Sequence, residues 1–359
     1  MKIAALYFNE VGPLQNKKID LADSWTDDFS RKVLFSGPNG TGKSIALRMI
    51  AMLWDAAGYW LDQLGKMPKS EPAYSWLSKW RGCSVIFDEV FIGSGPVGLI
   101  FGLMEWFEEM KCSGDILGKS TADITWIGET FQDTGKSGRP AQNFFVAGDE
   151  SVIFRWAKLR KKLILTFETG IAPNMVYLDA EERRWVSPKR KVGKPESEDS
   201  KLRWLVRYNA TEDWRGQLEA SLITLKVSKL HFFHEIVREL NCFLHGKEID
   251  TEIRTGENRL RVKLQNFRGQ SHFLDDLSAG EHQILIQLYL LQRWLEQGGI
   301  LLIDEPDLHL HPSLIPGFLA SLESLVEKKK GQLLLTSHLP DVWDRYESIG
   351  RRISLGGEL

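Results

Sequence analysis

A glycine-rich segment at residues 37–44 constrains the fold of this chain more than any other feature. It follows an apolar run at residues 33–36 and precedes residues 45–64, where apolar side chains recur at helical spacing. This order predicts a strand, a glycine loop and a helix, in which inward-pointing backbone N–H groups and the positive helix end cradle phosphate. Lys43 would reach the outer phosphates, and the Ser44 hydroxyl would hold Mg²⁺. The predicted cradle consists of Gly37, Pro38, Asn39, Gly40, Thr41, Gly42, Lys43 and Ser44.

An acidic pair ends a second apolar run, at residues 300–305. In a parallel sheet, ligands bind at the carboxyl ends of the strands, so Asp304 and Glu305 are expected near the phosphate loop. Asp304 would fix Mg²⁺ through a water, and Glu305 would orient and polarise the water that attacks the γ-phosphate. His338 ends the next apolar strand, where its imidazole could donate to the same phosphate.

A capping box opens another predicted helix at residues 277–281. Ser278 and Glu281 have the spacing of a capping box, which is a sufficient structural explanation. The same geometry also suits anion binding, because a serine hydroxyl and free N–H groups lie at a helix start and Gly280 has no side chain to block close approach. Both interpretations remain open at this point.

The strand and helix patterns predict an α/β fold with a parallel core sheet, an antiparallel β subdomain and a helical lobe. Residues 97–110 are predicted to form an apolar helix, and residues 214–244 a sustained amphipathic helix. The expected organisation is an N-terminal lobe (1–185), a polar linker or insertion (186–201), a helical lobe with connecting strands (202–276) and a C-terminal nucleotide-binding part (277–359). The runs predicted as strands of the antiparallel sheet are 84–92, 124–131, 143–147, 152–156, 163–167 and 175–178.

Composition indicates the compartment and the kinds of partner that suit this chain. Its 359 residues carry a net charge of only -2, so no overall field draws it to nucleic acid or to an anionic membrane. The three cysteines are far apart, which fits a reducing cytoplasm. With no apolar leader or span, the sequence predicts a cytoplasmic protein without a membrane partner.

Together these motifs resemble the Walker A, signature, Walker B and switch-histidine motifs of ABC-type ATPases. The matching segments are residues 37–44, 277–281, 301–306 and 337–338. In detail they are most similar to the RecF, Rad50 and SMC-like branch and to the OLD-like AAA ATPases of bacterial genome maintenance and phage defence. The run at residues 304–312 is similar to the last group in particular.

The resemblance implies an ATP- and Mg²⁺-dependent ATPase that works as a head-to-tail homodimer. The phosphate loop, Asp304, Glu305 and His338 of one subunit would be completed by Ser278 and Gly280 of the other. ATP would then join two surfaces, and hydrolysis would remove the group that bridges them.

Several positions depart from the family pattern. The signature has Ala279 where glycine is usual and Glu281 where glutamine is common, and His311 stands where many relatives have an aspartate. The family glutamine that faces Mg²⁺ has no clear counterpart. Its role remains unassigned among Asp179, Glu181, Glu182, Gln132 and Gln142.

Two further features have alternative interpretations. Tyr7, Phe8 or Trp25 could stack on adenine, although a core position is the more common role of such residues. Residues 155–215 carry fifteen Lys or Arg against nine Asp or Glu, a net of +6. This segment is interpreted equally well as a nucleic-acid contact or as a solvated linker.

The leading functional hypothesis is an intracellular ATPase whose ATP-driven dimerisation controls a DNA-directed or anti-phage defence activity. A separately encoded effector is expected, because little sequence follows His338. The alternatives are the ATP-binding subunit of a membrane transporter and a non-catalytic, ATP-responsive scaffold.

Overall fold

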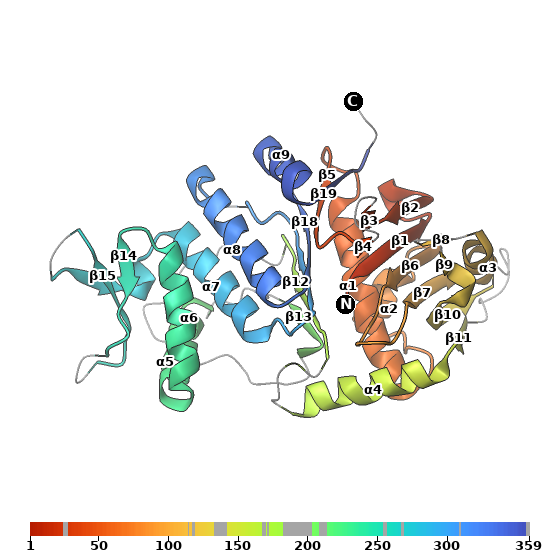
Figure 1. Ribbon diagram of the computed structural model, residues 1–359, viewed down its shortest axis with the longest axis horizontal. Helices are drawn as coiled ribbons and strands as arrows, with labels where there is room; N and C mark the ends of the chain where they lie inside the picture. Colours follow the sequence, from red (N-terminus) through yellow and green to blue (C-terminus); the bar gives the residue numbers. More distant parts are fainter. Residues whose placement is uncertain are drawn as a thin grey trace.

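A six-stranded parallel sheet forms the centre of the molecule in a computed structural model (Figure 1). Its order is β13-β12-β17-β18-β5-β19, and every neighbouring pair in it is parallel. The strands are β5 (Lys32–Ser36), β12 (Met175–Leu178), β13 (Leu205–Arg207), β17 (Ile300–Ile303), β18 (Gln332–Thr336) and β19 (Arg351–Ser354). The structure describes residues 1–23, 28–113, 115–116, 119–132, 142–166, 170, 172–181, 203–207, 214–253, 257–266, 269–308 and 310–356.

Both faces of this sheet are covered, which explains the continuous apolar runs in its strands. Val33 and Phe35 of β5 pack on the side of α1 (Lys43–Gln63), whereas Leu34 packs on the opposite side. That opposite side carries α7 (Ala279–Trp294), α8 (Ile315–Lys328) and α9 (Pro340–Ile349). Successive side chains of a strand point to opposite faces, so each apolar residue has a core to enter.

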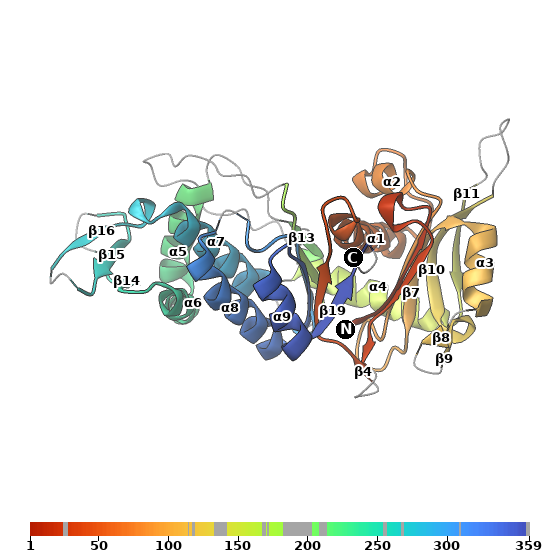
Figure 2. The same ribbon diagram turned by 90° about the horizontal axis from the view of Figure 1, so that it is seen from above.

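A second sheet covers the other side of α1, so that α1 is enclosed between two sheets (Figure 2). Its order is β11-β10-β7-β6-β1-β2, antiparallel except for the β10–β7 pair. The strands are β1 (Ile3–Asn9), β2 (Lys17–Asp20), β6 (Gly82–Phe87), β7 (Val97–Leu103), β10 (Thr125–Phe131) and β11 (Gln142–Ala147). The outer face packs against α3 (Met104–Ser113) through Phe107 and Met110.

A helical arm extends away from the two sheets, at the left of Figure 1. It contains α5 (Trp214–Ser228) and α6 (Leu230–Phe243), followed by a small sheet of β14 (Lys247–Ile249), β15 (Arg261–Leu264) and β16 (Ser271–Phe273). Phe233, Val237 and Leu240 of α6 are buried in the core that also contains α7. None of the helices in the described ranges combines the length and the apolar character needed to cross a membrane.

Smaller elements complete the two lobes. Helix α4 (Glu150–Leu165) packs on α1, where Trp156 of α4 and Trp54 of α1 are both buried and their rings lie 5.6 Å apart. Further described elements are α2 (Pro72–Leu77), β3 (Ala22–Asp23), β4 (Asp28–Phe29), β8 (Asp115–Ile116) and β9 (Lys119–Ser120).

The α/β class, the parallel core, the antiparallel subdomain and the helical lobe are confirmed. Five local predictions are wrong. Residues 97–103 form a strand that pairs with β6 and β10, where Gly98 leaves room for Trp126, and only the rest of the predicted helix is helical, in α3. Residues 152–156 and 163–167 were predicted as strands, but 150–165 form α4, with Asp149 capping its start.

The other two corrections concern pairing and helix length. Residues 175–178 do form a strand, but it lies in the parallel sheet rather than in the antiparallel one. The predicted helix at 214–244 is two helices, which are separated at Lys229, where the backbone is not helical. The predicted linker at 186–201 lies outside the described residues.

Candidate functional site

The phosphate loop connects β5 to α1, as the sequence predicts. Gly37, Gly40 and Gly42 have φ angles of 140°, 80° and 95°, which residues with a side chain rarely adopt. Gly37 is also required sterically, because a Cβ atom there would lie 2.1 Å from the carbonyl oxygen of Leu355. That contact arises because β19 pairs with β5 and Leu355 N donates to Ser36 O at 2.8 Å. Strand β19 and the residue that follows it therefore pack against the start of the phosphate loop.

Lys43 begins α1 and points back into the loop. Its Nζ donates to the carbonyl oxygens of Gly37 and Pro38, both at 2.8 Å. Burial lowers the pKa of the Lys43 ammonium, while the carboxylates of Glu305 and Asp304 act in the opposite direction. A polyphosphate would give this cation a stronger partner than two carbonyl oxygens, since charge-assisted hydrogen bonds are the stronger ones.

Ser44 and Asp304 meet although 260 residues separate them. Ser44 Oγ donates to Asp304 Oδ1 at 3.1 Å, and Thr336 Oγ1 donates to the same oxygen at 2.6 Å. Burial raises the pKa of the Asp304 carboxyl, and the nearby carboxylates of Asp179 and Glu305 add to the rise. A buried carboxylate beside a hydroxyl is a donor set that suits Mg²⁺, which prefers oxygen ligands. Ser44 and Asp304 therefore fit a magnesium ion.

Glu305 and His338 face each other across neighbouring parallel strands. His338 Nε2 lies 2.9 Å from Glu305 Oε1, and both side chains are partly exposed. Glu305 has a φ of 48°, an uncommon backbone conformation for a residue with a side chain. Its N–H donates to Thr336 Oγ1 at 2.9 Å, which holds the residue in this conformation. A carboxylate so placed can accept a proton from a water near the loop.

Thr336 is a residue of the candidate site that the sequence patterns missed. Its hydroxyl contacts the carboxylate of Asp304 and the backbone of Glu305, so one side chain orients both members of the acidic pair. Its position two residues before His338, at the end of β18, was the available signal. A threonine there is also a common strand residue, so the pattern alone does not distinguish the two roles.

Asp179 occupies the place next to the acidic pair. It follows β12, and Asp304 N donates to Leu178 O at 2.9 Å across the two strands. Arg48 of α1 donates to Asp179 Oδ2 at 2.6 Å, and Tyr177 donates to the same oxygen at 2.9 Å. Burial alone would raise the pKa of Asp179, but the hydrogen bonds from Arg48 and from the Glu181 N–H lower it.

These contacts bear on the five residues considered for the role of the glutamine that faces Mg²⁺ in ABC-type ATPases. Gln132 follows the end of β10 and Gln142 begins β11 in the second sheet, where the Gln142 amide donates to buried Glu129. Glu181 is largely exposed and pairs with Arg48 at 2.9 Å, and Glu182 lies outside the described residues. Among these candidates, Asp179 lies beside Asp304 and accepts a hydrogen bond from Arg48, an arginine that the sequence patterns did not single out.

Ser278 and Gly280 lie at the start of α7, which follows the small sheet of the helical arm in the chain (Figure 1). The predicted capping box is present: Ser278 Oγ accepts from Glu281 N at 3.4 Å, and Glu281 Oε2 accepts from Ser278 N at 3.0 Å. Among the described residues, a Cβ atom on Gly280 would meet Leu314 and Leu310, at 3.5 and 3.7 Å. These are ordinary contacts, so the fold itself does not require glycine there.

The proposed stacking of an aromatic residue on adenine finds no support in β1. Tyr7 and Phe8 are buried, with 8% and 2% of their surface exposed, and belong to the cores on the two faces of the second sheet. Trp25 lies outside the described residues. His311 caps a short helical turn by accepting from Ser313 N at 3.3 Å, and its neighbour His309 also lies outside the described part.

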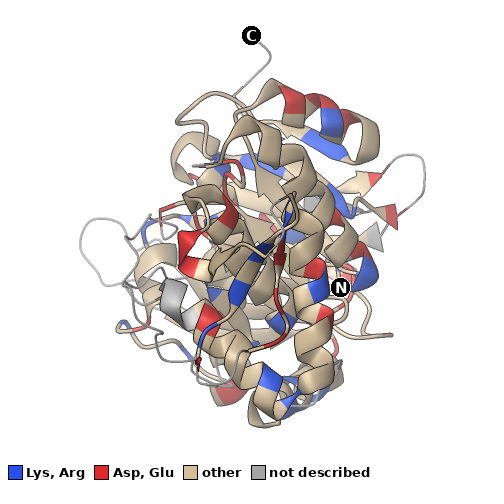
Figure 3. Ribbon diagram, turned by 90° about the vertical axis from the view of Figure 1, so that its left-hand side faces the viewer, with Lys and Arg blue, Asp and Glu red and all other residues tan. Residues whose placement is uncertain are grey.

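The basic segment at residues 155–215 is only partly described. Of its described members, Arg160 pairs with Asp62 and Arg203 pairs with buried Glu296, so both are structural. Lys158, Lys161 and Lys162 are exposed on α4. Figure 3 shows blue and red residues interspersed over the described ribbon, as seen from the end of the helical arm.

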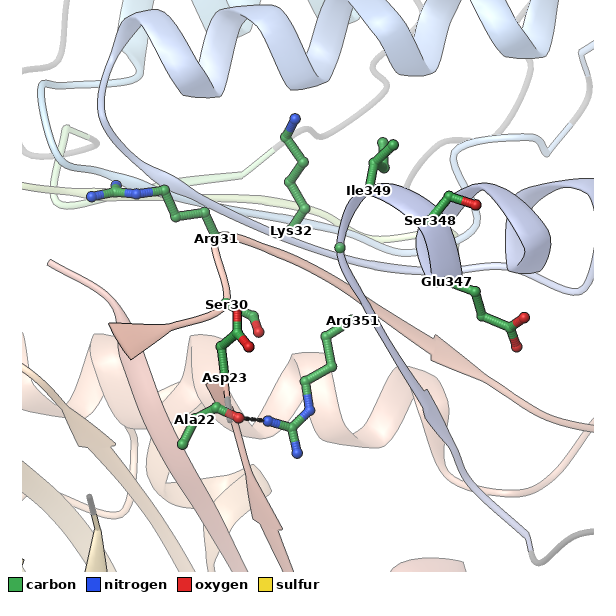
Figure 4. Close-up of a pocket in the computed structure, with 10 residues that line it drawn as sticks. Ala22, Asp23, Ser30, Arg31, Lys32, Glu347, Ser348, Ile349 and Arg351 are labelled. Atoms are coloured by element: carbon green, nitrogen blue, oxygen red, sulfur yellow. Dashed lines mark hydrogen bonds between the residues drawn. The ribbon is translucent and has the colours of Figure 1, made fainter. Parts of the chain in front are cut away.

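Two cavities flank the ends of β5 and β19. One, of about 930 Å³, is lined by the loop residues Gly37, Pro38 and Asn39 together with His338 and Trp343. The other, of about 700 Å³, lies at the opposite, amino ends of the strands (Figure 4). The two arginine side chains that line it bond to different backbone carbonyl oxygens: Arg351 donates to Ala22 O and Arg31 donates to Lys330 O. Only the first cavity adjoins the residues that could act on a phosphate.

Comparison with known proteins identifies one family. Residues 184–344 match the family described as "AAA domain, putative AbiEii toxin, Type IV TA system", just under half of the chain. Protein ea59 of Escherichia phage lambda is 28% identical over 96 residues, which cover 25% of this chain and 18% of that protein. The matched segment is thus a small part of its relative.

Solved structures give weaker likenesses over most of the chain. The SMC head domain from Thermotoga maritima has a TM-score of 0.45 at 14% identity, covering 96% of this chain and 92% of that one. The Smc head domain from Pyrococcus furiosus has a TM-score of 0.41 at 12% identity, covering 98% and 92%. No functional conclusion follows from similarities at this level.

Proposed function

We propose that this chain is an ABC-type, SMC-like AAA ATPase and that it hydrolyses ATP at a site shared between two copies. Lys43 would bind the outer phosphates, Ser44 and Asp304 would hold Mg²⁺, and Glu305 with His338 would act at the γ-phosphate. The magnesium ion would neutralise phosphate charge. The observation that carries the proposal is the meeting of Ser44, Asp304, Thr336, Glu305 and His338 at the end of the phosphate loop.

The chemistry follows from these positions. Glu305 would accept a proton from the attacking water, and Thr336 keeps its carboxylate and that of Asp304 in place. His338, 2.9 Å from Glu305, would orient that carboxylate and donate to the γ-phosphate. Arg48 holds Asp179 beside the metal ligands, so that Asp179 would contribute to the second coordination shell.

The shared site is supported by Ser278 and Gly280. They lie at the start of α7, and the fold does not need glycine at position 280. A second subunit arranged head to tail would bring this helix start to the nucleotide. Two such sites would then bridge the dimer, and hydrolysis would release it.

We further propose that the dimer controls a defence or DNA-directed activity through a separately encoded protein. The family description, a putative toxin of a type IV TA system, favours a two-component arrangement. The exposed lysines of α4 are a candidate contact for a nucleic-acid backbone. Free Cys83, Cys112 and Cys242 suit a reducing compartment, which we propose to be the cytoplasm.

Replacing Lys43 with alanine tests the nucleotide site. The change removes the buried ammonium from the loop, and we expect ATP affinity to fall by about 10- to 100-fold, the usual worth of a hydrogen bond to a charged group. Isothermal titration with Mg·ATP measures it. Lys66→Ala, outside α1, is the control. Unchanged ATP affinity in Lys43→Ala would remove the basis for the site.

Replacing Gly280 with alanine tests the shared surface. We expect an unchanged melting temperature, because the new methyl group meets only ordinary contacts within the subunit, but about tenfold weaker ATP-dependent dimerisation from crowding against the partner. Gly317→Ala in α8 is the matched control, since its Cβ would likewise make an ordinary contact, with Phe243 at 3.6 Å. Equal dimerisation of the two variants would contradict a close approach at Gly280.

A further inference from the structure

Glu281 forms a charged cluster around the signature serine. Its Oε2 accepts from the Ser278 hydroxyl at 2.7 Å as well as from Ser278 N. Lys247 Nζ donates to both carboxylate oxygens of Glu281 at 2.9 Å. Lys247 belongs to β14, so the small sheet of the arm reaches the start of α7 through this ion pair. The side chains of Lys247 and Glu281 are 28% and 15% exposed.

This hydrogen bond has a consequence for anion binding. A hydroxyl has one proton to donate, and Ser278 gives it to Glu281. To donate to a phosphate instead, the hydroxyl must turn away from the carboxylate. The Ser278 side chain alone would then lie between the Glu281 carboxylate and the phosphate, and these two negative groups would repel each other.

We propose that Lys247 is a positioning residue that neutralises Glu281 so that the signature can accept a phosphate. The inference rests on the proposed shared site and names a residue outside its recognised motifs. Glutamine at position 281 would complete the capping box without charge. This chain has Glu281 at that position, and the positive charge of Lys247 balances its negative charge.

The effect of removing Lys247 follows from the charge left behind. In Lys247→Ala the carboxylate of Glu281 remains without its cation beside the phosphate-binding hydroxyl. We expect about tenfold weaker association at each shared site, and therefore about a hundredfold weaker dimer, since a head-to-tail dimer has two such sites. Replacing Glu281 with glutamine as well removes the unpaired negative charge. The double variant Lys247→Ala/Glu281→Gln should therefore recover dimerisation to within about threefold of the parent.

The experiment uses the full chain with Glu305→Gln as the parent, because slowed hydrolysis preserves the ATP-bound state. Dimerisation with Mg·ATP is measured by sedimentation over a range of protein concentrations. Lys247→Arg retains the charge and should dimerise like the parent. Lys263→Ala is the matched control, because Lys263 lies on neighbouring β15 and pairs with Asp250 at 2.9 Å. Melting temperatures verify folding, and Lys247→Met replaces Lys247→Ala if the alanine variant is unfolded.

The outcomes separate three explanations. Weak dimerisation of Lys247→Ala with recovery in the double variant supports the proposal. A double variant as weak as Lys247→Ala would overturn it, since Lys247 would then contact the phosphate directly or hold the arm in place. Dimerisation of Lys247→Ala at the parent level would also overturn it. A parent that fails to dimerise with ATP, or dimerises equally with Ser278→Arg, would instead refute the shared site itself.

Discussion

ATP turnover by the Glu305→Gln protein is expected to be at least about a hundredfold slower than that of the unaltered chain. General-base catalysis contributes about 10²- to 10⁴-fold, and an amide cannot accept the proton of the attacking water. The change keeps the shape of a residue whose backbone Thr336 holds in an uncommon conformation. Phosphate release under saturating Mg·ATP measures the effect.

The Glu305→Gln protein should still bind ATP and dimerise, because the loop and the signature are intact. Glu327→Gln is the matched control, since Glu327 is exposed on α8. Turnover by Glu305→Gln at more than about a tenth of the normal rate would mean that another group is the base. A pull-down of this variant with ATP would also recover proteins that bind the closed dimer.

Ser278→Arg is expected to abolish ATP-dependent dimerisation and, with it, hydrolysis. Arginine at the start of α7 adds bulk where the opposing phosphate would approach and removes the hydroxyl that would donate to it. Losing the helix cap costs only about 1 kcal/mol, so the subunit should remain folded. Light scattering with and without Mg·ATP measures dimerisation, and Ser75→Arg, at an exposed position of α2, is the control.

Mixing two inactive variants gives the sharpest test of the shared site. In a heterodimer of Ser278→Arg with Lys43→Ala, one site combines both defects, while the other has an intact phosphate loop and an intact signature. Hydrolysis should therefore reappear on mixing. Absence of any recovery, or full activity of a Ser278→Arg monomer, would show that each subunit works alone.

Local sequence patterns predicted the parts of the site that depend on a few neighbouring residues. The phosphate loop, the Ser278 capping box and the apolar strands ending in Asp304 and His338 are all present. Each follows from interactions within about one helical turn or one strand. Residues 97–103 show the limit of such patterns, because a short apolar run fits a buried strand as well as a helix.

Sequence alone therefore established the α/β class, the order of the motifs and the residues expected at a nucleotide. The tertiary structure decided how those residues are held: Thr336 against Asp304, Arg48 against Asp179, and Lys247 against Glu281. These partners are 32, 131 and 34 residues apart in the chain. No periodic pattern encodes such pairs, because they depend on which strands become neighbours and on the register of their pairing.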